Sequence, residues 1–286
     1  MDFTKMQGTA NDFVLVDARN LQRNWSEMVV TICDRHLGVG AGSLLLLLSS
    51  DKADFYMRTF DADGSEAETC GNGIRCLARY ALEKGLIDSN ADNMIVETLA
   101  GISTIRFEKA NCEVIKFWAN MGKPRLTAEE IALLAQPGNG YVTEINSMLC
   151  YSVSLEGINL NLNMVSMGNP HAIYFTKEPV SQFPLSRIGP VVEALPVFLN
   201  RVNFMIARVL GQDNLEARSW ERGIGETLAC GSGACAITVA SKLLGYTGHR
   251  VDIKLPGGIL NADWNGDGEV ILGGPAETVF EGKWPD

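Results

Sequence analysis

One phrase occurs twice in this chain and constrains the fold more than any other feature. Residues 66–76 read EAETCGNGIRC and residues 226–235 read ETLACGSGAC. In each copy a cysteine precedes a Gly-x-Gly turn, and an apolar pattern at helical spacing then runs to Gly85 or Gly245. We interpret the two copies as an internal duplication whose period is too long for a solenoid and suits two similar domains.

The rest of the chain predicts a strand-rich α+β protein. The helix after the second cysteine is apolar around most of its circumference, which is typical of a buried helix. We expect strands at residues 44–48, 54–60, 94–99, 102–107, 202–209 and 215–220. Two further helices are expected at residues 27–36, capped by Ser26, and from the capping box at Thr127 to about residue 135. The predicted domains are residues 1–121 plus 275–286, and residues 122–274.

Composition excludes several classes of function. The 24 basic and 34 acidic residues give a net charge of -10, which argues against a nucleic-acid partner. No apolar run is long enough to span a bilayer, and the first residues do not resemble a secretory signal. Seven cysteines, an odd number without any Cys-x-x-Cys, favour a reducing cytoplasm and no metal site.

The chemistry of the repeated phrase follows from glycine and cysteine together. The first N–H groups of a helix have no internal partner, so each Gly-x-Gly turn offers donors to an anion such as a carboxylate. A helix N-terminus also lowers the pKa of a thiol, so Cys70 and Cys230 are expected to favour the thiolate. If both phrases face one substrate, one cysteine removes a proton and the other returns a proton on the opposite face. That is inversion by two bases, and it requires no metal or organic cofactor.

Other interpretations of the two cysteines stay open on the residues alone. A single cysteine in a glycine-rich turn is more often structural than catalytic. The pair would also suit a disulfide, a redox switch or a binding module. The repetition before two buried helices favours the catalytic interpretation.

At these residues the chain resembles the diaminopimelate epimerases, which are two-cysteine isomerases of lysine and cell-wall biosynthesis. The resemblance covers the whole chain in order, and its motifs are Gly8–Phe13, Ala62–Gly73, Met167–His171, Ile188–Pro190, Arg201–Phe204, Trp220–Gly223 and Gly225–Cys235.

The resemblance implies two pseudo-symmetric domains, each a barrel-like sheet around a central helix, with the active site in the cleft between them. The implied reaction is the epimerisation of LL- to meso-diaminopimelate without pyridoxal phosphate. The implied catalytic residues are Cys70, Cys230, Glu221 and His171. Those implied to bind the substrate are Asn11, Asp61, Gly71, Asn72, Asn169, Asn203, Arg222, Gly231 and Ser232, with Arg222 on the distal carboxylate. The partner is then a small amino acid, with a homodimer as the candidate assembly.

Four positions depart from the pattern of the family. Gln7 stands where the family usually has histidine, and Gly42 and Ser43 where it has an acidic residue and then glycine or glutamine. Asp61 replaces an asparagine that helps to hold the distal end of the substrate. A carboxylate there would repel a carboxylate and suit a cation, so a racemase of another, basic amino acid is the alternative function.

Overall fold

The computed structural model describes residues 1–68, 70–111, 113–134 and 140–285. The chain forms two compact units. Unit 1 comprises Met1–Asn120 and the C-terminal segment from Gly273, and unit 2 is Met121–Leu272. The sequence predicts two domains with boundaries at residues 121 and 275. That these domains fold independently remains a prediction.

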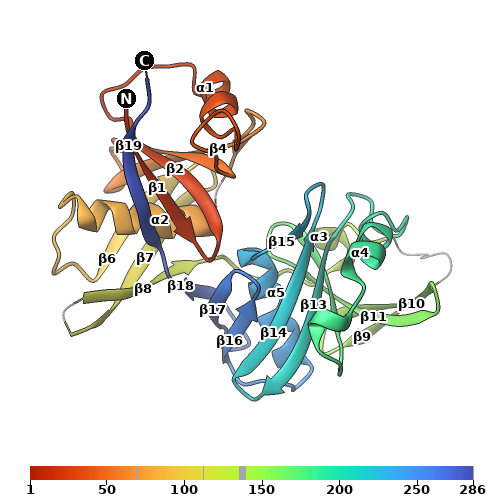
Figure 1. Ribbon diagram of the computed structural model, residues 1–286. Coiled ribbons are helices and arrows are strands. Elements are labelled where there is room, and N and C mark those ends of the chain that lie inside the picture. Colours follow the sequence, from red (N-terminus) through yellow and green to blue (C-terminus); the bar gives the residue numbers. More distant parts are fainter. Residues whose placement is uncertain (69, 112, 135–139, 286) are drawn as a thin grey trace. The chain divides into compact units, whose positions relative to one another are not determined.

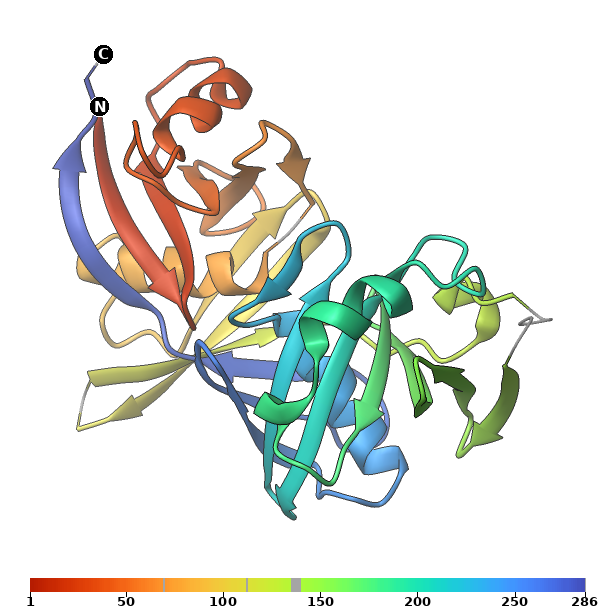
Figure 2. The same cartoon turned by 45° about the vertical axis from the view of Figure 1, so that its right-hand side comes forward.

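Unit 1 contains most of the first half of the chain and its last strand. Its strands are β1 (Asp2–Gly8), β2 (Asn11–Asp17), β3 (Ser43–Leu48), β4 (Phe55–Asp61), β5 (Glu66–Ala67), β6 (Asn93–Thr98), β7 (Gly101–Ala110), β8 (Glu113–Asn120) and β19 (Glu277–Lys283). Its helices are α1 (Trp25–Ile32) and α2 (Gly71–Glu83). The C-terminal strand β19 lies antiparallel beside β1, as Figures 1 and 2 both show.

The leucine run of β3 explains how unit 1 is layered. Neighbouring side chains of a strand point to opposite faces. Leu45 and Leu47 pack with α2 in one core cluster, whereas Leu44 and Leu46 pack with α1 in another. A strand covered on both faces reads as a continuous apolar run, which is why five leucines in succession form one strand.

Unit 2 repeats this plan with additional helices. Its strands are β9 (Tyr141–Ile145), β10 (Met148–Leu155), β11 (Ile158–Ser166), β12 (Pro170–Phe175), β13 (Asn203–Gly211), β14 (Asn214–Glu221), β15 (Gly225–Thr227), β16 (Arg250–Leu255) and β17 (Gly258–Asp263). Its helices are α3 (Ala128–Ile131), the 3₁₀ helix η1 (Val180–Gln182), α4 (Leu185–Glu193) and α5 (Gly231–Leu243), and β18 (Ile271–Gly274) spans the boundary of the two units.

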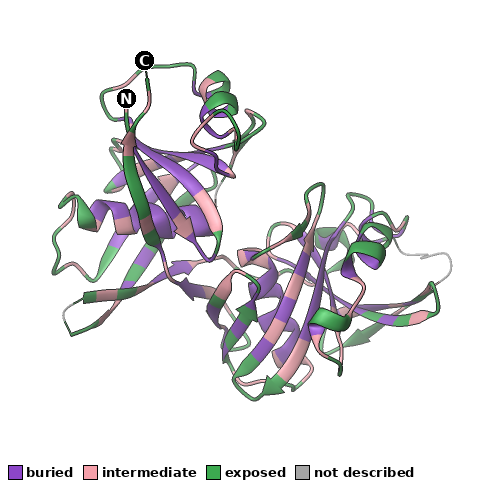
Figure 3. Cartoon of the chain, in the orientation of Figure 1, coloured by how far each residue is buried: buried purple, intermediate pink, exposed green. Residues whose placement is uncertain are grey.

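The central strand β13 of unit 2 is also covered on both faces. Met205 and Ala207 pack in the cluster that contains α5, and Phe204 and Ile206 pack in the cluster that contains α4. Strands β1 and β13 are buried along most of their length, whereas β19 is largely exposed (Figure 3).

Strand pairing confirms the expected pseudo-symmetry. In unit 1, β2 and β3 are parallel, β3 and β4 antiparallel, β4 also pairs with the short β5, and β4 and β6 are parallel. In unit 2 the same sequence of pairs joins β12, β13, β14, β15 and β16. Even an ion pair recurs, because Arg58 binds Glu66 at 2.6 Å and Arg218 binds Glu226 at 2.8 Å.

The expected strand-rich, barrel-like sheet is confirmed, but it is not closed. Within the described residues of unit 1, pairing runs from β19 through β1 to β8, β8 also pairs with β18, and no pair joins β8 to β19.

Two helix predictions need correction, and one helix was missed. The first helix is Trp25–Ile32, and its N-cap is Asn24 rather than Ser26. It ends before residue 36 because the Asp34 carboxylate accepts from the N–H groups of His36 and Leu37 and folds the chain into a turn. The capping box at Thr127 is present, but its helix ends at Ile131, since Ala132 is left-handed at φ 58°. Residue 135, the expected end, lies outside the described residues. Helix α4 was not predicted, because Gly189 and Pro190 lie inside it.

Candidate active site

Cys70 caps helix α2 in unit 1. Its backbone is extended, at φ −143° and ψ 108°, and its Sγ accepts from the N–H of Gly73 at 3.4 Å. The first intrahelical bond runs from Ile74 N to Cys70 O. The N–H groups of Gly71 and Asn72 therefore precede the internal ladder of the helix, as expected for a helix N-terminus.

Cys230 caps helix α5 in unit 2 with the same geometry. Its backbone lies at φ −128° and ψ 114°, and its Sγ accepts from the N–H of Gly233 at 3.4 Å. The hydroxyl of Ser232 lies 3.6 Å from the same sulfur. The two phrases found in the sequence thus form the same local structure.

The glycine three residues after each cysteine is required by space. A Cβ on Gly73 would lie 2.9 Å from a methyl group of Leu45, and a Cβ on Gly233 would lie 2.6 Å from the sulfur of Met205. Both glycines therefore allow the helix N-terminus to lie against the central strand of its sheet.

Burial changes the expected ionisation of the two thiols. Desolvation is the largest influence on each, and it raises the pKa of Cys70 and raises that of Cys230 well above the ordinary value. The N–H donors of Gly73 and Gly233 lower the pKa by less than burial raises it. The expectation that both cysteines favour the thiolate is therefore wrong for the free chain.

A hydrogen-bonded chain of side chains extends from Cys230. The amide of Asn169 donates to Ser232 Oγ at 3.4 Å, and its Oδ1 lies 3.0 Å from Nε2 of His171. Both residues come from the segment that enters β12. Unit 2 thereby brings Asn169, His171, Ser232 and Cys230 into one network of contacts.

His171 is fully buried and neutral. Burial, followed by the charge of Arg222, lowers its pKa to about 3. Because Oδ1 of Asn169 is an acceptor, Nε2 of His171 carries the proton. Nδ1 is buried and has no hydrogen-bond partner among the described residues. At neutral pH the ring can accept a hydrogen bond there but holds no charge.

Glu221 ends strand β14 beside Cys230. Its Oε1 accepts from the hydroxyl of Thr227 at 2.6 Å. Burial raises the pKa of Glu221, and hydrogen bonds from Thr227 and Cys230 oppose that rise. A carboxylate near a thiol, where each group shifts the pKa of the other, is suited to exchange a proton with it.

Asn203 and Arg222 are held together at the end of the same strand pair. The Oδ1 of Asn203 accepts from the backbone N–H of Arg222 at 2.9 Å, and its amide donates to Pro170 O at 3.2 Å. The guanidinium of Arg222 donates to Asn200 O at 2.7 Å. These bonds fix the start of the turn that follows Glu221.

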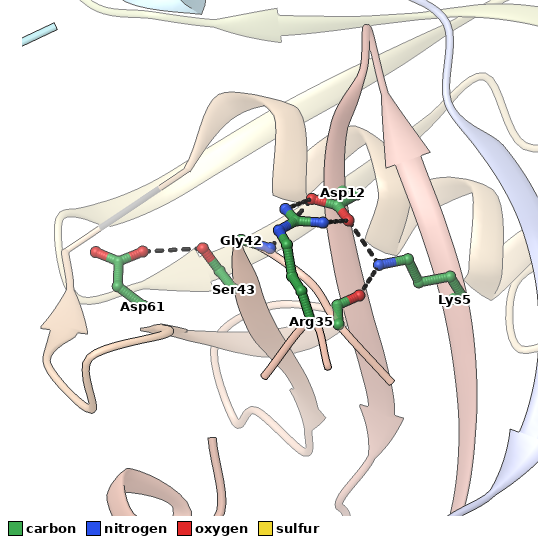
Figure 4. A network of polar contacts seen from close by, with 7 residues as sticks. Lys5, Asp12, Arg35, Gly42, Ser43 and Asp61 are labelled. Atoms are coloured by element: carbon green, nitrogen blue, oxygen red, sulfur yellow. Dashed lines mark hydrogen bonds and ion pairs between the residues drawn. The ribbon is translucent and has the colours of Figure 1, made fainter. Parts of the chain in front are cut away.

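The corresponding corner of unit 1 holds Asp61, which ends β4 as Glu221 ends β14. Its Oδ1 accepts from the hydroxyl of Ser43 at 2.9 Å, as Figure 4 shows. Two of the four positions that depart from the family pattern are therefore bonded to each other.

A charged network stands next to this pair in Figure 4. Arg35 binds Asp12 with two nitrogens, at 3.0 and 2.8 Å, and Lys5 binds the same carboxylate at 2.7 Å while donating to Gly40 O. The N–H of Gly42 donates to Asp12 Oδ1 at 3.1 Å. Burial opposes ionisation of Asp12, but the bonds from Arg35 and Lys5 hold its pKa below the usual range.

Asn11 lies at the end of a strained hairpin in unit 1. It pairs with Gly8 across a turn whose residues Thr9 and Ala10 have φ of 58° and 61°. Positive φ is costly for a β-branched residue, so the turn needs support. Gln7 gives part of it, because its Oε1 accepts from Ala10 N at 2.8 Å.

Sequence reasoning missed three groups that hold the site. They are Thr227, Ser43 and Arg75, which bind Glu221, Asp61 and Asn72. Arg75 could have been found, because it is the one charged residue among the first six of helix α2. Thr227 carries no signal of its own in the sequence, and Ser43 was noted only as a departure from the family pattern.

No group of three or more metal-ligating side chains occurs among the residues that the structure covers. In that same part of the chain, no helix is long and apolar enough to cross a membrane. The six described cysteines are all free of disulfides.

Comparison with known proteins identifies the family. The diaminopimelate epimerase family model matches residues 3–127 and 163–279. The diaminopimelate epimerase of Methanococcus maripaludis strain S2 is 43% identical over 286 residues, which cover 99% of each chain. The chain belongs to the diaminopimelate epimerase family. The family member from Pelotomaculum thermopropionicum is 42% identical over 290 residues, covering 100% of this chain and 99% of the other.

Solved structures of proteins with other names have a fold similar to that of this chain. A PhzF-family phenazine biosynthesis protein of Bacillus anthracis superposes with a TM-score of 0.71 at 17% identity, over 98% of this chain and 97% of the other. A hydroxyproline epimerase of Agrobacterium vitis, with bound trans-4-hydroxy-L-proline, gives 0.68 at 14% identity, over 99% and 91%. At such identities the likeness concerns the two-domain, strand-rich fold.

Proposed function

We propose that this protein is an isomerase that epimerises LL-diaminopimelate to meso-diaminopimelate by two-base chemistry at Cys70 and Cys230. The observation that carries the proposal is the repeated cap, in which each cysteine accepts from the N–H of the glycine three residues on. Family membership supplies the substrate.

The proposed reaction transfers protons without any change of oxidation state. One cysteine, as thiolate, takes the α-proton of the substrate, and the electron pair moves into the substrate carboxylate. The N–H groups of Gly71, Asn72, Gly231 and Ser232 are the proposed donors that stabilise this charge. The other cysteine, as thiol, donates its proton to the opposite face. No cofactor is needed, and the reaction requires both helix N-termini to face one carboxylate.

Residues around each cysteine have supporting roles in this proposal. Glu221 exchanges a proton with Cys230, since its carboxylate is near enough to raise the pKa of that thiol. His171 acts by accepting a hydrogen bond at Nδ1, because its ring is neutral and that atom is buried. The proposed contacts to the rest of the substrate are Asn11, Asp61, Asn169, Asn203 and Arg222.

Asp61 makes a basic amino acid the second candidate class of substrate. Its carboxylate is exposed and is held by Ser43, so it suits an ammonium group rather than a carboxylate. Diaminopimelate also carries a distal ammonium, so Asp61 is compatible with the proposed substrate if it binds that group.

Exchange of the α-hydrogen in deuterated water tests the proposal. We expect deuterium in LL- and meso-diaminopimelate without added cofactor, and little in lysine, ornithine, arginine or histidine. Exchange in a basic amino acid alone would favour the racemase. Absence of exchange in every substrate would favour the thiol switch or binding module over an enzyme.

A homodimer and a cytoplasmic location remain predictions from the sequence. Sedimentation equilibrium of the purified chain tests the first of them, and a monomer at all concentrations would contradict it.

A further inference from the structure

The β1–β2 hairpin of unit 1 turns through two residues that do not favour its conformation. Thr9 and Ala10 both have positive φ, and the turn joins Gly8 to Asn11. Two-residue hairpin turns with positive φ at both positions strongly prefer Asn-Gly or Asp-Gly, and a β-branched residue there is strained. Thr9 is nevertheless only 2% exposed. The conformation of this turn therefore depends on contacts from beyond the hairpin.

The buried guanidinium of Arg75 supplies such contacts. Arg75 lies in the second turn of α2 and is 0% exposed. Its Nη2 donates to Thr9 Oγ1 at 3.2 Å and to Asn72 Oδ1 at 2.8 Å. Its Nε donates to Pro275 O at 3.3 Å. One side chain thus joins the first hairpin, the first turn of α2 and the segment that leads into β19, all of which belong to unit 1.

The hairpin also packs directly against the start of α2. A Cβ on Gly8 would lie 3.4 Å from the carbonyl oxygen of Asn72 and 3.5 Å from Nη2 of Arg75. A guanidinium is always charged and holds its N–H donors in a rigid fork, so a bond to one partner fixes the direction of the others. If the turn moved away from the helix, a buried charged donor would lose the hydroxyl of Thr9, which is costly.

Unit 2 makes the equivalent connection in a different way. The turn between β11 and β12 carries Asn169, whose amide donates directly to Ser232 Oγ at 3.4 Å. Ser232 and Asn72 are each the second residue after a capping cysteine. Cys235 stands where Arg75 would be in α5, five residues after the cap. Each unit therefore bonds the turn before β2 or β12 to the same helix position, and only unit 1 does so through a guanidinium.

We propose that Arg75 is a positioning residue that holds the turn of Thr9, and with it Asn11, against the N-terminus of α2. The guanidinium thereby keeps two proposed substrate contacts, Asn11 and Asn72, in one arrangement before the substrate binds. Groups that are already ordered need not be fixed on binding, which increases affinity. Arg75 touches neither substrate nor reacting atoms in this account. Its effect on substrate binding rests on the proposed function, but the positioning is a property of the free protein.

Steady-state epimerisation of diaminopimelate by variants of the full chain tests the effect on binding. Arg75→Lys keeps the charge but loses the fork, so we expect KM to rise by about tenfold with a smaller change in kcat. Arg79→Lys is the matched control, because Arg79 lies on the same helix, is 36% exposed and pairs with Glu83 at 2.6 Å. A KM that is equally unchanged in both folded variants would overturn the proposal.

Two variants of Thr9 keep the test decisive if Arg75→Lys does not fold. Thr9→Ser retains the hydroxyl that accepts from Arg75 and should keep the wild-type KM. Thr9→Val has nearly the same shape without the hydroxyl, so it should raise KM as Arg75→Lys does. Equal KM values in folded Thr9→Ser and Thr9→Val proteins would show that the bond to the guanidinium does not position the turn.

Amide hydrogen exchange of the free protein tests the positioning itself. Peptides that contain residues 8–12 and 71–74 should exchange faster in Arg75→Lys and Thr9→Val than in the wild type, by about tenfold. The turn at Asn146 and Ser147, which also has two positive φ values but lies in unit 2, should exchange at the wild-type rate. Wild-type exchange at residues 8–12 in both variants would overturn the proposal. Because no substrate is present, faster exchange in a chain without epimerase activity would support the positioning and refute only the proposed function.

Discussion

Asp61 and Glu221 occupy equivalent places in the two units. Each is the last residue of its strand, nine residues before a capping cysteine, and each carboxyl accepts from a hydroxyl, that of Ser43 at 2.9 Å or Thr227 at 2.6 Å. The duplicated scaffold thus places a carboxylate at the end of the equivalent strand in each unit, and each carboxylate raises the pKa of the cysteine that follows it. The partners that hold these carboxylates come from different strands, so the two halves have diverged around a common arrangement.

The glycines behind the caps should be sensitive to a single methyl group. Gly233→Ala brings a Cβ to 2.6 Å from Met205 Sδ, and Gly73→Ala brings one to 2.9 Å from Leu45. We expect each to lower the free energy of unfolding by about 1–3 kcal/mol and to reduce kcat, since the cysteine must shift with the helix. Gly211→Ala is the control, because nothing lies within 4 Å of its Cβ. Thermal melts and steady-state kinetics measure both effects, and wild-type behaviour of both variants would contradict the packing account.

His171 should make stability depend on pH below neutrality. Its folded pKa of about 3 lies below its unfolded value, so the unfolded chain binds a proton that the folded chain does not. Stability should therefore fall as the pH drops from about 6.5 toward 3, by on the order of 3–5 kcal/mol from this residue.

Urea unfolding as a function of pH measures that dependence. His171→Gln should flatten the curve in this window. An equally steep curve in His171→Gln would show that the histidine is not held neutral by burial.

Glu193 should support the loop that carries Arg222. This buried carboxylate accepts from the indole of Trp220 at 2.8 Å, from Gly223 N at 2.9 Å and from Arg201 at 3.2 Å. Glu193→Gln removes charge-assisted acceptors and should cost about 1.5–3 kcal/mol of stability, with a higher KM. Glu178→Gln on the exposed surface is the control. Unchanged stability and KM would mean that the loop does not depend on these bonds.

The sequence predicted those parts of the fold and site that depend on local chemistry. The caps at Cys70 and Cys230 could be predicted because Gly-x-Gly before an apolar helix has few other interpretations. The leucine run was recognised as a buried strand because both faces of β3 are covered.

The remaining features depend on distant contacts that leave no local pattern. Helix α4 forms although it contains Gly189 and Pro190, because Trp220 packs where a side chain on Gly189 would lie. The effect of burial on the thiols exceeds that of the helix N-terminus, and only the packed structure shows it. The bond between Ser43 and Asp61 joins strands and likewise required the fold.

The central claim is that two cysteines work on one α-carbon, and the epimerisation of diaminopimelate by proteins that lack one of the two cysteines tests it most directly. In Cys70→Ala and Cys230→Ala proteins that remain folded, we expect epimerisation of diaminopimelate to fall by at least about 10²–10⁴-fold. Cys76→Ala and Cys235→Ala, inside the same helices, should retain most of it. Full epimerisation by Cys70→Ala or by Cys230→Ala would contradict the two-base account.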